Sequence, residues 1–192
     1  MITLSKRNKR KLLKLLISLL LIGLGWLATR ATPPPAVQQT VSPGFYNIVS
    51  FEDGDTITVD MDGTTERIRM IGVDTPETKD PRKPVQCFGR AASDFTKQLI
   101  GSSSVRLEAD ELSSNRDRYN RLLRYVYLPD GRLVEAEIIR QGYGFAYTSF
   151  PFTKSDEFKA HEKDAREANR GLWGNCQPTS NNYGGFTSNP AP

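Results

Sequence analysis

Three short segments rich in β-branched and apolar residues follow one another closely in the chain, at residues 45–51, 56–61 and 65–73. Segments of this kind, bounded by turn residues, are typical of β-strands. Asp62-Gly63 separates the second segment from the third, and this dipeptide is a strong signal for a two-residue hairpin turn. The sequence therefore predicts that the folded part of the chain begins with a β-sheet that contains an antiparallel hairpin.

Helical and β patterns alternate after this first sheet. Residues 88–100 carry apolar side chains at helical spacing, and Gly101 after them favours the end of a helix. The same reasoning predicts strands at 105–108 and 122–128, and helices at 134–141 and 156–169. This order indicates the α+β class, with a five-stranded OB-fold β-barrel and about three packed α-helices.

The two ends of the chain differ in composition from this domain, which spans 45–176. Residues 1–31 join a basic segment to an uncharged apolar run, the layout of an export signal. We expect a signal peptide or an uncleaved membrane anchor there; a buried helix is the alternative, which the basic flank and the absence of acids disfavour. Residues 32–44, with three consecutive prolines, predict an extended linker. Residues 177–192, uncharged and rich in Asn, Ser, Gly and Pro, predict a disordered tail.

The net charge of +4 comes from the N-terminal segment. Of the 26 Lys and Arg residues, seven lie in residues 1–31 together with none of the 22 acidic residues, so the rest of the chain is slightly negative. Global charge therefore gives no support for nucleic-acid binding, and any such function must rest on local clusters. Because a basic flank stays in the cytoplasm, we expect an exported domain, secreted, periplasmic or anchored to the outer side of the cytoplasmic membrane.

The chain contains two cysteines, Cys87 and Cys176, and one histidine, His161. An exported pair of cysteines invites a disulfide, and two unrelated buried thiols are the alternative. Two Cys and one His cannot form a usual four-ligand structural zinc site. A single histidine also excludes nucleases that need a histidine pair, and the helical spacing around His161 indicates a packed or surface residue.

Two polar clusters near the first strands contain metal-ligand chemistry. Asp55 follows an Asp-Gly turn, and Asp74, Thr75 and Glu77 follow Arg69 in a loop that contains a proline. Two carboxylates and a backbone carbonyl of Thr75 are hard oxygen ligands that suit Ca²⁺ and leave positions open for water and substrate. Glu77 could then take a proton from a water near the metal. Taken alone, each cluster could equally be a solvated turn or surface loop.

A third cluster, residues 116–121, interleaves arginines with Tyr119. The planar guanidinium groups of Arg118 and Arg121 match phosphate oxygens bidentately, and Tyr119 could stack on a nucleotide. A solvated polar loop is the alternative for this cluster alone. The presence of all three clusters on one chain favours a phosphate-handling site.

With these clusters in place, residues 45–173 resemble the thermonuclease (staphylococcal-nuclease-like) family. The matching strings are Asp53-Gly54-Asp55-Thr56, Arg69 with Val73-Asp74-Thr75-Pro76-Glu77-Thr78, Asp117-Arg118-Tyr119-Asn120-Arg121, and Arg140-Gln141-Gly142. Asp74-Thr75-Pro76-Glu77 after a hydrophobic strand is highly specific, whereas Asp-Gly-Asp alone is not. The resemblance implies an OB-fold and Ca²⁺-dependent hydrolysis of DNA and RNA phosphodiesters that leaves 3′-phosphates and 5′-hydroxyls.

The resemblance also implies a role for each matching residue. The metal ligands are Asp55, Asp74 and the carbonyl of Thr75; the general base is Glu77; the residues that bind the scissile phosphate are Arg69 and Arg121; the nucleotide contacts are Arg118, Tyr119 and Tyr147. Asn120 stands where the family often has glycine, so we expect a local difference in that loop.

These patterns predict a Ca²⁺-dependent endonuclease that acts on DNA and RNA, preferably single-stranded or denatured. We expect a monomer that meets the membrane only through residues 1–31. The alternative is a non-catalytic OB-fold module that binds nucleic acid or a protein at the cell surface. Such a module could lose Glu77 or a metal aspartate without penalty, and this chain has kept both.

Overall fold

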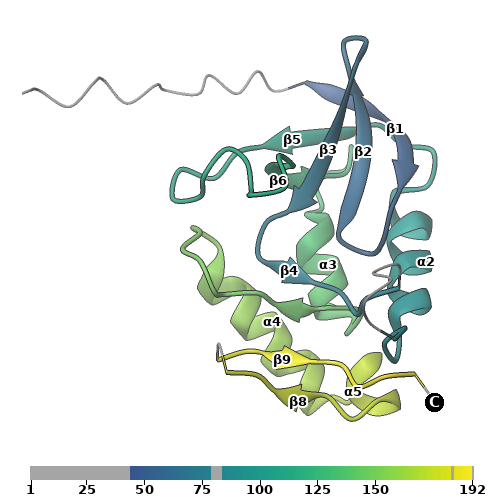
Figure 1. The fold of residues 1–192 in the computed structure, drawn as a ribbon, viewed down its shortest axis with the longest axis vertical. Helices are drawn as coiled ribbons and strands as arrows, with labels where there is room; N and C mark the ends of the chain where they lie inside the picture. Colours follow the sequence, from purple (N-terminus) through teal and green to yellow (C-terminus); the bar gives the residue numbers. More distant parts are fainter. Residues whose placement is uncertain (1–43, 79–83, 183, 192) are drawn as a thin grey trace, which may run out of the picture. The chain divides into compact units, whose positions relative to one another are not determined.

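The computed structural model describes residues 44–78, 84–182 and 184–191. Five strands in this part form a closed barrel in the order β1-β2-β3-β6-β5 (Figure 1). Every neighbouring pair is antiparallel except β3 and β6, which run parallel. The strands are β1 (Phe45–Phe51), β2 (Thr56–Met61), β3 (Thr64–Met70), β5 (Val105–Glu108) and β6 (Leu122–Tyr127). The predicted α+β class and five-stranded OB-fold barrel are confirmed.

The predicted hairpin joins β2 to β3. Asp62 and Gly63 both have positive φ, 55° and 86°, as the favoured two-residue hairpin turn requires. Asp60 completes the turn, because its Oδ1 accepts a hydrogen bond from the Gly63 N–H (2.7 Å). The resulting register pairs Thr56 with Arg69, so the start of β2 lies beside the end of β3.

A single strand over residues 65–73 was expected, and this expectation is wrong. β3 ends at Met70, and β4 (Val73–Asp74) pairs with β7 (Phe145–Ala146) in a separate two-stranded sheet. Gly72 makes the break with φ 74°. A Cβ there would lie 2.6 Å from the ring of Phe152, so only glycine allows this turn to pack closely. The segment 73–75 is thereby directed away from the barrel sheet.

Helices cover the barrel and extend the core. α2 (Gly89–Ile100) lies along its side and α3 (Val134–Arg140) below it, with α4 (Ser155–Glu167) and the unpredicted short α5 (Leu172–Asn175) farther away (Figure 1). The core combines side chains of the barrel and the helices, and burying each large apolar side chain contributes about 1.5–3 kcal/mol. Fully buried members include Ile57, Val59, Ile68, Val126, Ile138, Ile139 and Phe158.

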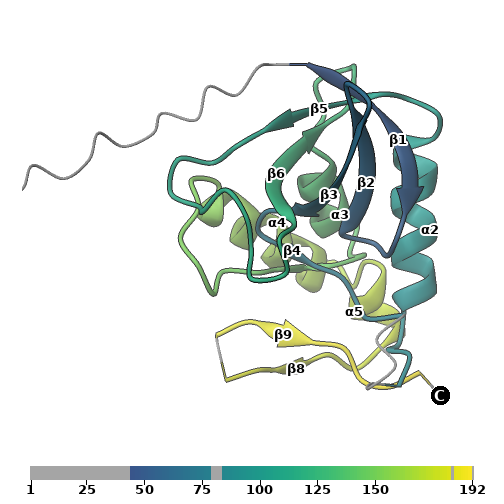
Figure 2. The ribbon, with the colours of Figure 1, turned by 45° about the horizontal axis from the view of Figure 1, so that its top comes forward.

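The expected disorder of residues 177–192 is wrong for the described part of this segment. β8 (Thr179–Ser180) and β9 (Phe186–Thr187) form a hairpin near α5, visible in both views (Figures 1 and 2). The ring of Phe186 packs edge-on against Trp173 at 5.0 Å. A composition argument averages over the whole segment, whereas one aromatic side chain and a set of backbone hydrogen bonds decide its structure.

The predicted signal or anchor, and residues 32–43 of the predicted linker, lie outside the described residues. Among the residues that are described, no helix has the length and apolar character needed to cross a membrane.

Candidate active site

Asp55 lies between the Asp-Gly turn and β2, and only 5% of it is exposed. Its Oδ2 accepts hydrogen bonds from the backbone N–H (2.8 Å) and the hydroxyl (3.1 Å) of Thr75. Gly54 allows this approach, because a Cβ at that position would come within 2.8 Å of the Thr75 side chain. Thr96 of α2 fixes the turn by donating its hydroxyl to the Gly54 carbonyl (2.7 Å). Two clusters 20 positions apart in sequence thus meet.

Arg69, at the end of β3, is held by carboxylates and by backbone carbonyls. Its Nε lies 3.3 Å from Asp55 Oδ1, and one terminal nitrogen donates to Asp74 Oδ1 (3.1 Å). The other terminal nitrogen donates to the carbonyls of Met70 (2.9 Å) and Val73 (2.7 Å). Burial disfavours its charged form, but the neighbouring carboxylates, above all Asp55 and Asp74, raise the pKa of Arg69 above its usual value. The guanidinium is therefore charged and fixed in orientation.

Arg121 reaches the same network from the loop before β6. Its Nε donates to Asp117 Oδ2 (2.7 Å), and a terminal nitrogen donates to the hydroxyl of Thr56 (3.3 Å). The Thr56 hydroxyl in turn donates to Asp55 Oδ1 (3.0 Å). Burial opposes the ionised form of Asp117, but its hydrogen bonds from Arg121 lower the pKa of this carboxyl below its usual value. One threonine hydroxyl thus joins the Arg121 segment to the Asp55 carboxylate.

The loop before Arg121 presents Tyr119 to solvent, with 57% of the residue exposed. The guanidinium carbons of Arg118 and Arg121 lie 4.8 and 5.5 Å from the centre of its ring. Asn120 has φ 64°, in the left-handed region that glycine adopts freely and that Asn tolerates better than most residues. We expected this loop to differ locally because Asn120 replaces the glycine that the family often has. The backbone of Asn120 nevertheless has a conformation suited to glycine, so the difference lies in the side chain.

Tyr147 follows β7 and is hydrogen-bonded to the turn after Arg69. Its backbone N–H donates to the carbonyl of Gly72 (2.8 Å), and its side chain is near enough to Arg69 to contribute to the raised pKa of that guanidinium. Its ring packs edge-on against that of Phe150 at 5.2 Å, and Phe150 is exposed. This arrangement brings the Tyr147 ring near the arginine, with Phe150 packed against it.

Glu77 is half-buried in the loop that follows Thr75. Its Oε1 accepts a hydrogen bond from the Thr78 N–H (2.8 Å). Its backbone N–H donates to the side-chain Oε1 of Gln86 (2.7 Å), and its carbonyl accepts from the Gln86 N–H (2.9 Å). Gly89, the first residue of α2, packs so closely that a Cβ there would lie 2.9 Å from the Glu77 carbonyl oxygen. The start of α2 and Gln86 therefore set the position of Glu77.

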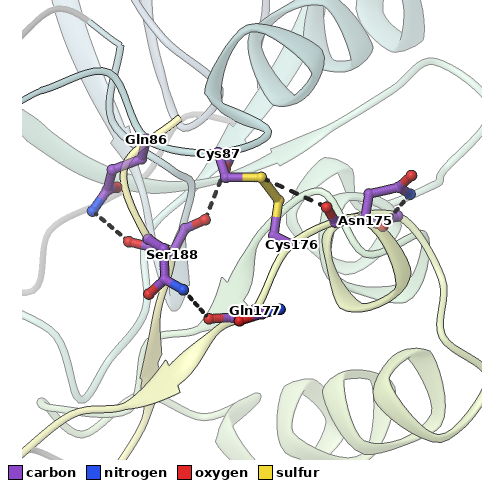
Figure 3. The surroundings of a disulfide bond; sticks show 8 residues. Gln86, Cys87, Asn175, Cys176, Gln177 and Ser188 are labelled. Atoms are coloured by element: carbon purple, nitrogen blue, oxygen red, sulfur yellow. Dashed lines mark hydrogen bonds between the residues drawn. A yellow bond between two sulfur atoms is a disulfide. The ribbon is translucent and has the colours of Figure 1, made fainter. Parts of the chain in front are cut away.

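Cys87 and Cys176 form a disulfide with a Cα–Cα distance of 6.0 Å (Figure 3). The sequence left their pairing open, and the structure joins them across 89 positions. Cys87 is adjacent to Gln86, so this cross-link ties the segment that contacts Glu77 to the region just after α5.

The oxygen atoms near Arg69 suit a hard cation. Asp55, Asp74 and the carbonyl of Thr75 offer oxygen ligands, which Ca²⁺ prefers. Burial and, after it, the charge of Asp55 raise the pKa of Asp53 to about 7, and the charge of Arg69 opposes this rise. Within the described ranges, no three His, Cys, Asp or Glu side chains are grouped to hold a metal by themselves. A bound ion would therefore keep several water ligands.

Comparison with known proteins identifies the family. A profile described as "Staphylococcal nuclease homologue" matches residues 67–175. The thermonuclease of Staphylococcus hyicus is 40% identical over 131 residues, which cover 68% of this chain and 76% of that protein. The chain belongs to the staphylococcal nuclease homologue family. Two further relatives, YokF and YncB of Bacillus subtilis strain 168, named as endonucleases, are each 41% identical over 123 residues, or 63% of this chain. The chain covers 41% of YokF and 57% of YncB.

The structure of this staphylococcal nuclease homologue joins Asp55, Asp74 and Thr75 to the two arginines in one network, whereas Glu77 is hydrogen-bonded to Thr78 and Gln86. It also adds two residues that were not given a role from the sequence. Asp117 pairs with Arg121, and an acid four residues before an arginine is a local signal that could have suggested this pair. Gln86 had no such signal, because its partners Glu77 and Ser188 lie 9 and 102 positions away.

Proposed function

We propose that the protein is a Ca²⁺-dependent endonuclease that hydrolyses phosphodiester bonds in DNA and RNA and leaves 3′-phosphates. The observation that carries this proposal is the hydrogen-bonded network that joins Asp55 directly to Arg69 and, through the Thr56 hydroxyl, to Arg121, with Glu77 in the adjoining loop. Membership of the staphylococcal nuclease homologue family, and relatives named thermonuclease and endonuclease, support a nuclease.

The two arginines suit the transition state of this reaction. Hydrolysis of a phosphodiester adds negative charge to a pentacoordinate phosphorus, and preorganised positive groups stabilise that charge. Arg69 is held by four oxygen partners, and Arg121 is held by Asp117 and Thr56, so both guanidinium groups are oriented before substrate binds. Removing one such group typically costs about 10²–10³-fold in turnover.

Asp55, Asp74 and the carbonyl of Thr75 would hold Ca²⁺, which when bound adds positive charge beside the phosphate and makes a nearby water more acidic. Glu77 would take the proton from the attacking water, a contribution of about 10²–10⁴-fold. The Thr78 N–H orients the carboxylate for this task by its hydrogen bond to Oε1.

The exposed ring of Tyr119 supports a preference for single-stranded or denatured substrates. Unpaired bases can stack on an aromatic side chain, and such stacking is worth about 1–3 kcal/mol per base. Arg118 and Arg121 beside the ring would hold the neighbouring phosphates. Tyr147 would supply a second contact to the nucleotide.

A non-catalytic binding module explains the site less well. A surface that only binds nucleic acid gains from arginines and loses from adjacent carboxylates, because these repel phosphate. Here Asp55 is buried beside Arg69 and is linked to Arg121 through the Thr56 hydroxyl, and Asp53 and Asp74 add further acid near Arg69. A metal-dependent catalyst accounts for this clustering of acids.

The direct test incubates the purified protein with denatured DNA and with RNA, in Ca²⁺ and in excess chelator. We expect cleavage with Ca²⁺, 3′-phosphate ends on the products, and no cleavage with chelator. Glu77→Gln should lower turnover by about 10²–10⁴-fold while most of the nucleotide affinity remains. Absence of cleavage with every divalent ion tried would remove the enzyme proposal, and wild-type turnover in the variant would remove the role of Glu77.

We also propose that the protein is exported as a monomer, secreted, periplasmic or attached to the outer side of the membrane through residues 1–31. The bonded cysteines support export, because structural disulfides persist in oxidising compartments. Cell fractionation with mass determination of the mature chain tests this proposal. Protein found only in the cytoplasm with reduced cysteines would contradict it.

A further inference from the structure

The end of the chain runs alongside the segment that contacts Glu77. After β9, Asn189 accepts a backbone hydrogen bond from the Cys87 N–H (2.7 Å), and the Ala191 N–H donates to the Val85 carbonyl (2.8 Å). Gln86 and Pro190 form an antiparallel bridge between these two bonds. The last residues therefore act as a short strand that pairs with residues 85–87.

Gln86 connects this terminal strand to the proposed general base. Its Nε2 donates to the carbonyl of Ser188 (3.1 Å), and its Oε1 accepts from the Glu77 N–H (2.7 Å). Figure 3 shows the side chain directed toward Ser188. A side-chain amide both donates and accepts, so Gln86 can serve both partners at once. Glu77 is thus linked through one side chain to a segment more than a hundred positions away.

Three further contacts hold the terminal strand in place. Ser188 is buried and donates its hydroxyl to the Cys87 carbonyl (2.8 Å). The side chain of Asn189 donates to the Gln177 carbonyl (2.5 Å). The disulfide joins Cys87 to Cys176, the residue before Gln177, and so connects the two segments that the strand contacts (Figure 3). The strand is therefore anchored both to the segment that contacts Glu77 and to the residues just after α5.

We propose that residues 186–191 are a positioning element of the nuclease site, acting through Gln86 on the backbone of Glu77. This inference rests on the proposed function. The terminal strand and the disulfide keep the Gln86 amide in place, and the amide fixes the point from which the Glu77 carboxylate extends. Gln86 is a positioning residue, since it contacts Glu77 rather than substrate. A misplacement of about 1 Å at a catalytic group can cost about 10²-fold in rate.

The test uses three changes in the otherwise complete chain. The first ends the chain after Gln177 and so retains the disulfide. The second, Gln86→Met, keeps the length of the side chain but removes its donor and acceptor. The third, Ser180→Ala, is a matched control at an exposed position in β8, within the same hairpin. Each change is made with Glu77 intact and with Glu77→Gln, and kcat, KM and Tm are measured with Ca²⁺ and denatured DNA.

We expect the shortened chain and Gln86→Met to lower kcat by about 10–100-fold with Glu77 intact, with little change in KM. In the Glu77→Gln background the same changes should have little further effect, because the group they position is absent. Ser180→Ala should match the unaltered chain. A general loss of structure would instead lower the rate by the same factor in both backgrounds.

Unchanged kcat in Gln86→Met, or an equal loss in both backgrounds, overturns the inference. If the shortened chain does not fold, Gln86→Met decides the matter alone. Cleavage by the unaltered chain is measured first, because it separates the two proposals. If the unaltered chain does not cleave DNA, both the nuclease function and the positioning role are refuted. If it does cleave DNA, the variants test the positioning role alone.

Discussion

The hydroxyl of Thr56 is the point where the Asp55 carboxylate and the Arg121 guanidinium meet, and Thr56→Val removes it while keeping the shape of the side chain. Thr56 is 1% exposed, so water cannot easily replace the lost group. A hydrogen bond to a charged group is worth about 1.5–3 kcal/mol. We expect the variant to lose about 2 kcal/mol of unfolding free energy, or roughly 4–8 °C in Tm for a domain of this size.

The same change should also lower activity. Arg121 keeps its bonds to Asp117 but loses its contact with Thr56, so its guanidinium is less well fixed near the developing charge. We expect about a tenfold lower kcat with little change in KM, which corresponds to about 1.4 kcal/mol of transition-state stabilisation. Initial rates on denatured DNA at saturating Ca²⁺, together with thermal unfolding, measure both effects.

Thr58→Val is the matched control for this experiment. Thr58 lies two positions along β2, is 7% exposed, and donates its hydroxyl to Glu52 Oε1 (3.1 Å). It therefore makes the same kind of bond to a carboxylate, but the carboxylate is that of Glu52, which pairs with Arg67. We expect a comparable loss of stability and unchanged kcat. Wild-type kcat in Thr56→Val, or equal losses of activity in both variants, would refute the link between Arg121 and Asp55.

Other contacts give further predictions. Asp110 accepts hydrogen bonds from the Tyr125 hydroxyl (2.8 Å) and the Thr153 N–H (2.7 Å). We therefore expect Asp110→Ala to lower the free energy of unfolding, measured in urea, by about 3 kcal/mol. A loss below about 1 kcal/mol would contradict this expectation. Burial opposes ionisation, but these bonds hold the pKa of Asp110 below its usual value. The stability they supply is present above the unfolded pKa, near 3.9, and is lost as the pH falls through the folded pKa. Urea midpoints measured from about pH 5 to pH 2 should thus fall less steeply in Asp110→Asn than in the wild type. Gly54→Ala would place a Cβ 2.8 Å from the Thr75 side chain. We expect weaker Ca²⁺ binding, measured as a higher Ca²⁺ concentration for half-maximal activity, and a loss of about 1–3 kcal/mol of unfolding free energy, measured by thermal unfolding.

Local patterns predicted much of the barrel because strands and hairpins depend on neighbours in sequence. β-branched runs and the Asp62-Gly63 turn encode local backbone angles, and the β2–β3 hairpin appears in the structure as expected. The expectation failed at Gly72, where contact with a ring 80 positions away in the chain determines the turn. It failed again for the tail, where partners at residues 85–87 and 173 supply the stability.

The site divides in the same way. The sequence alone determined which chemical groups are present: the two aspartates, Glu77, the two arginines and Tyr119 stand in short strings whose residue types suit metal and phosphate. Only the tertiary structure decided that Thr75 donates to Asp55, that Thr56 joins Arg121 to that carboxylate, and that the chain terminus reaches Gln86. The physical reason is that residue type sets the chemistry of each group, whereas contacts between distant segments exist only after barrel closure and helix packing have fixed every element.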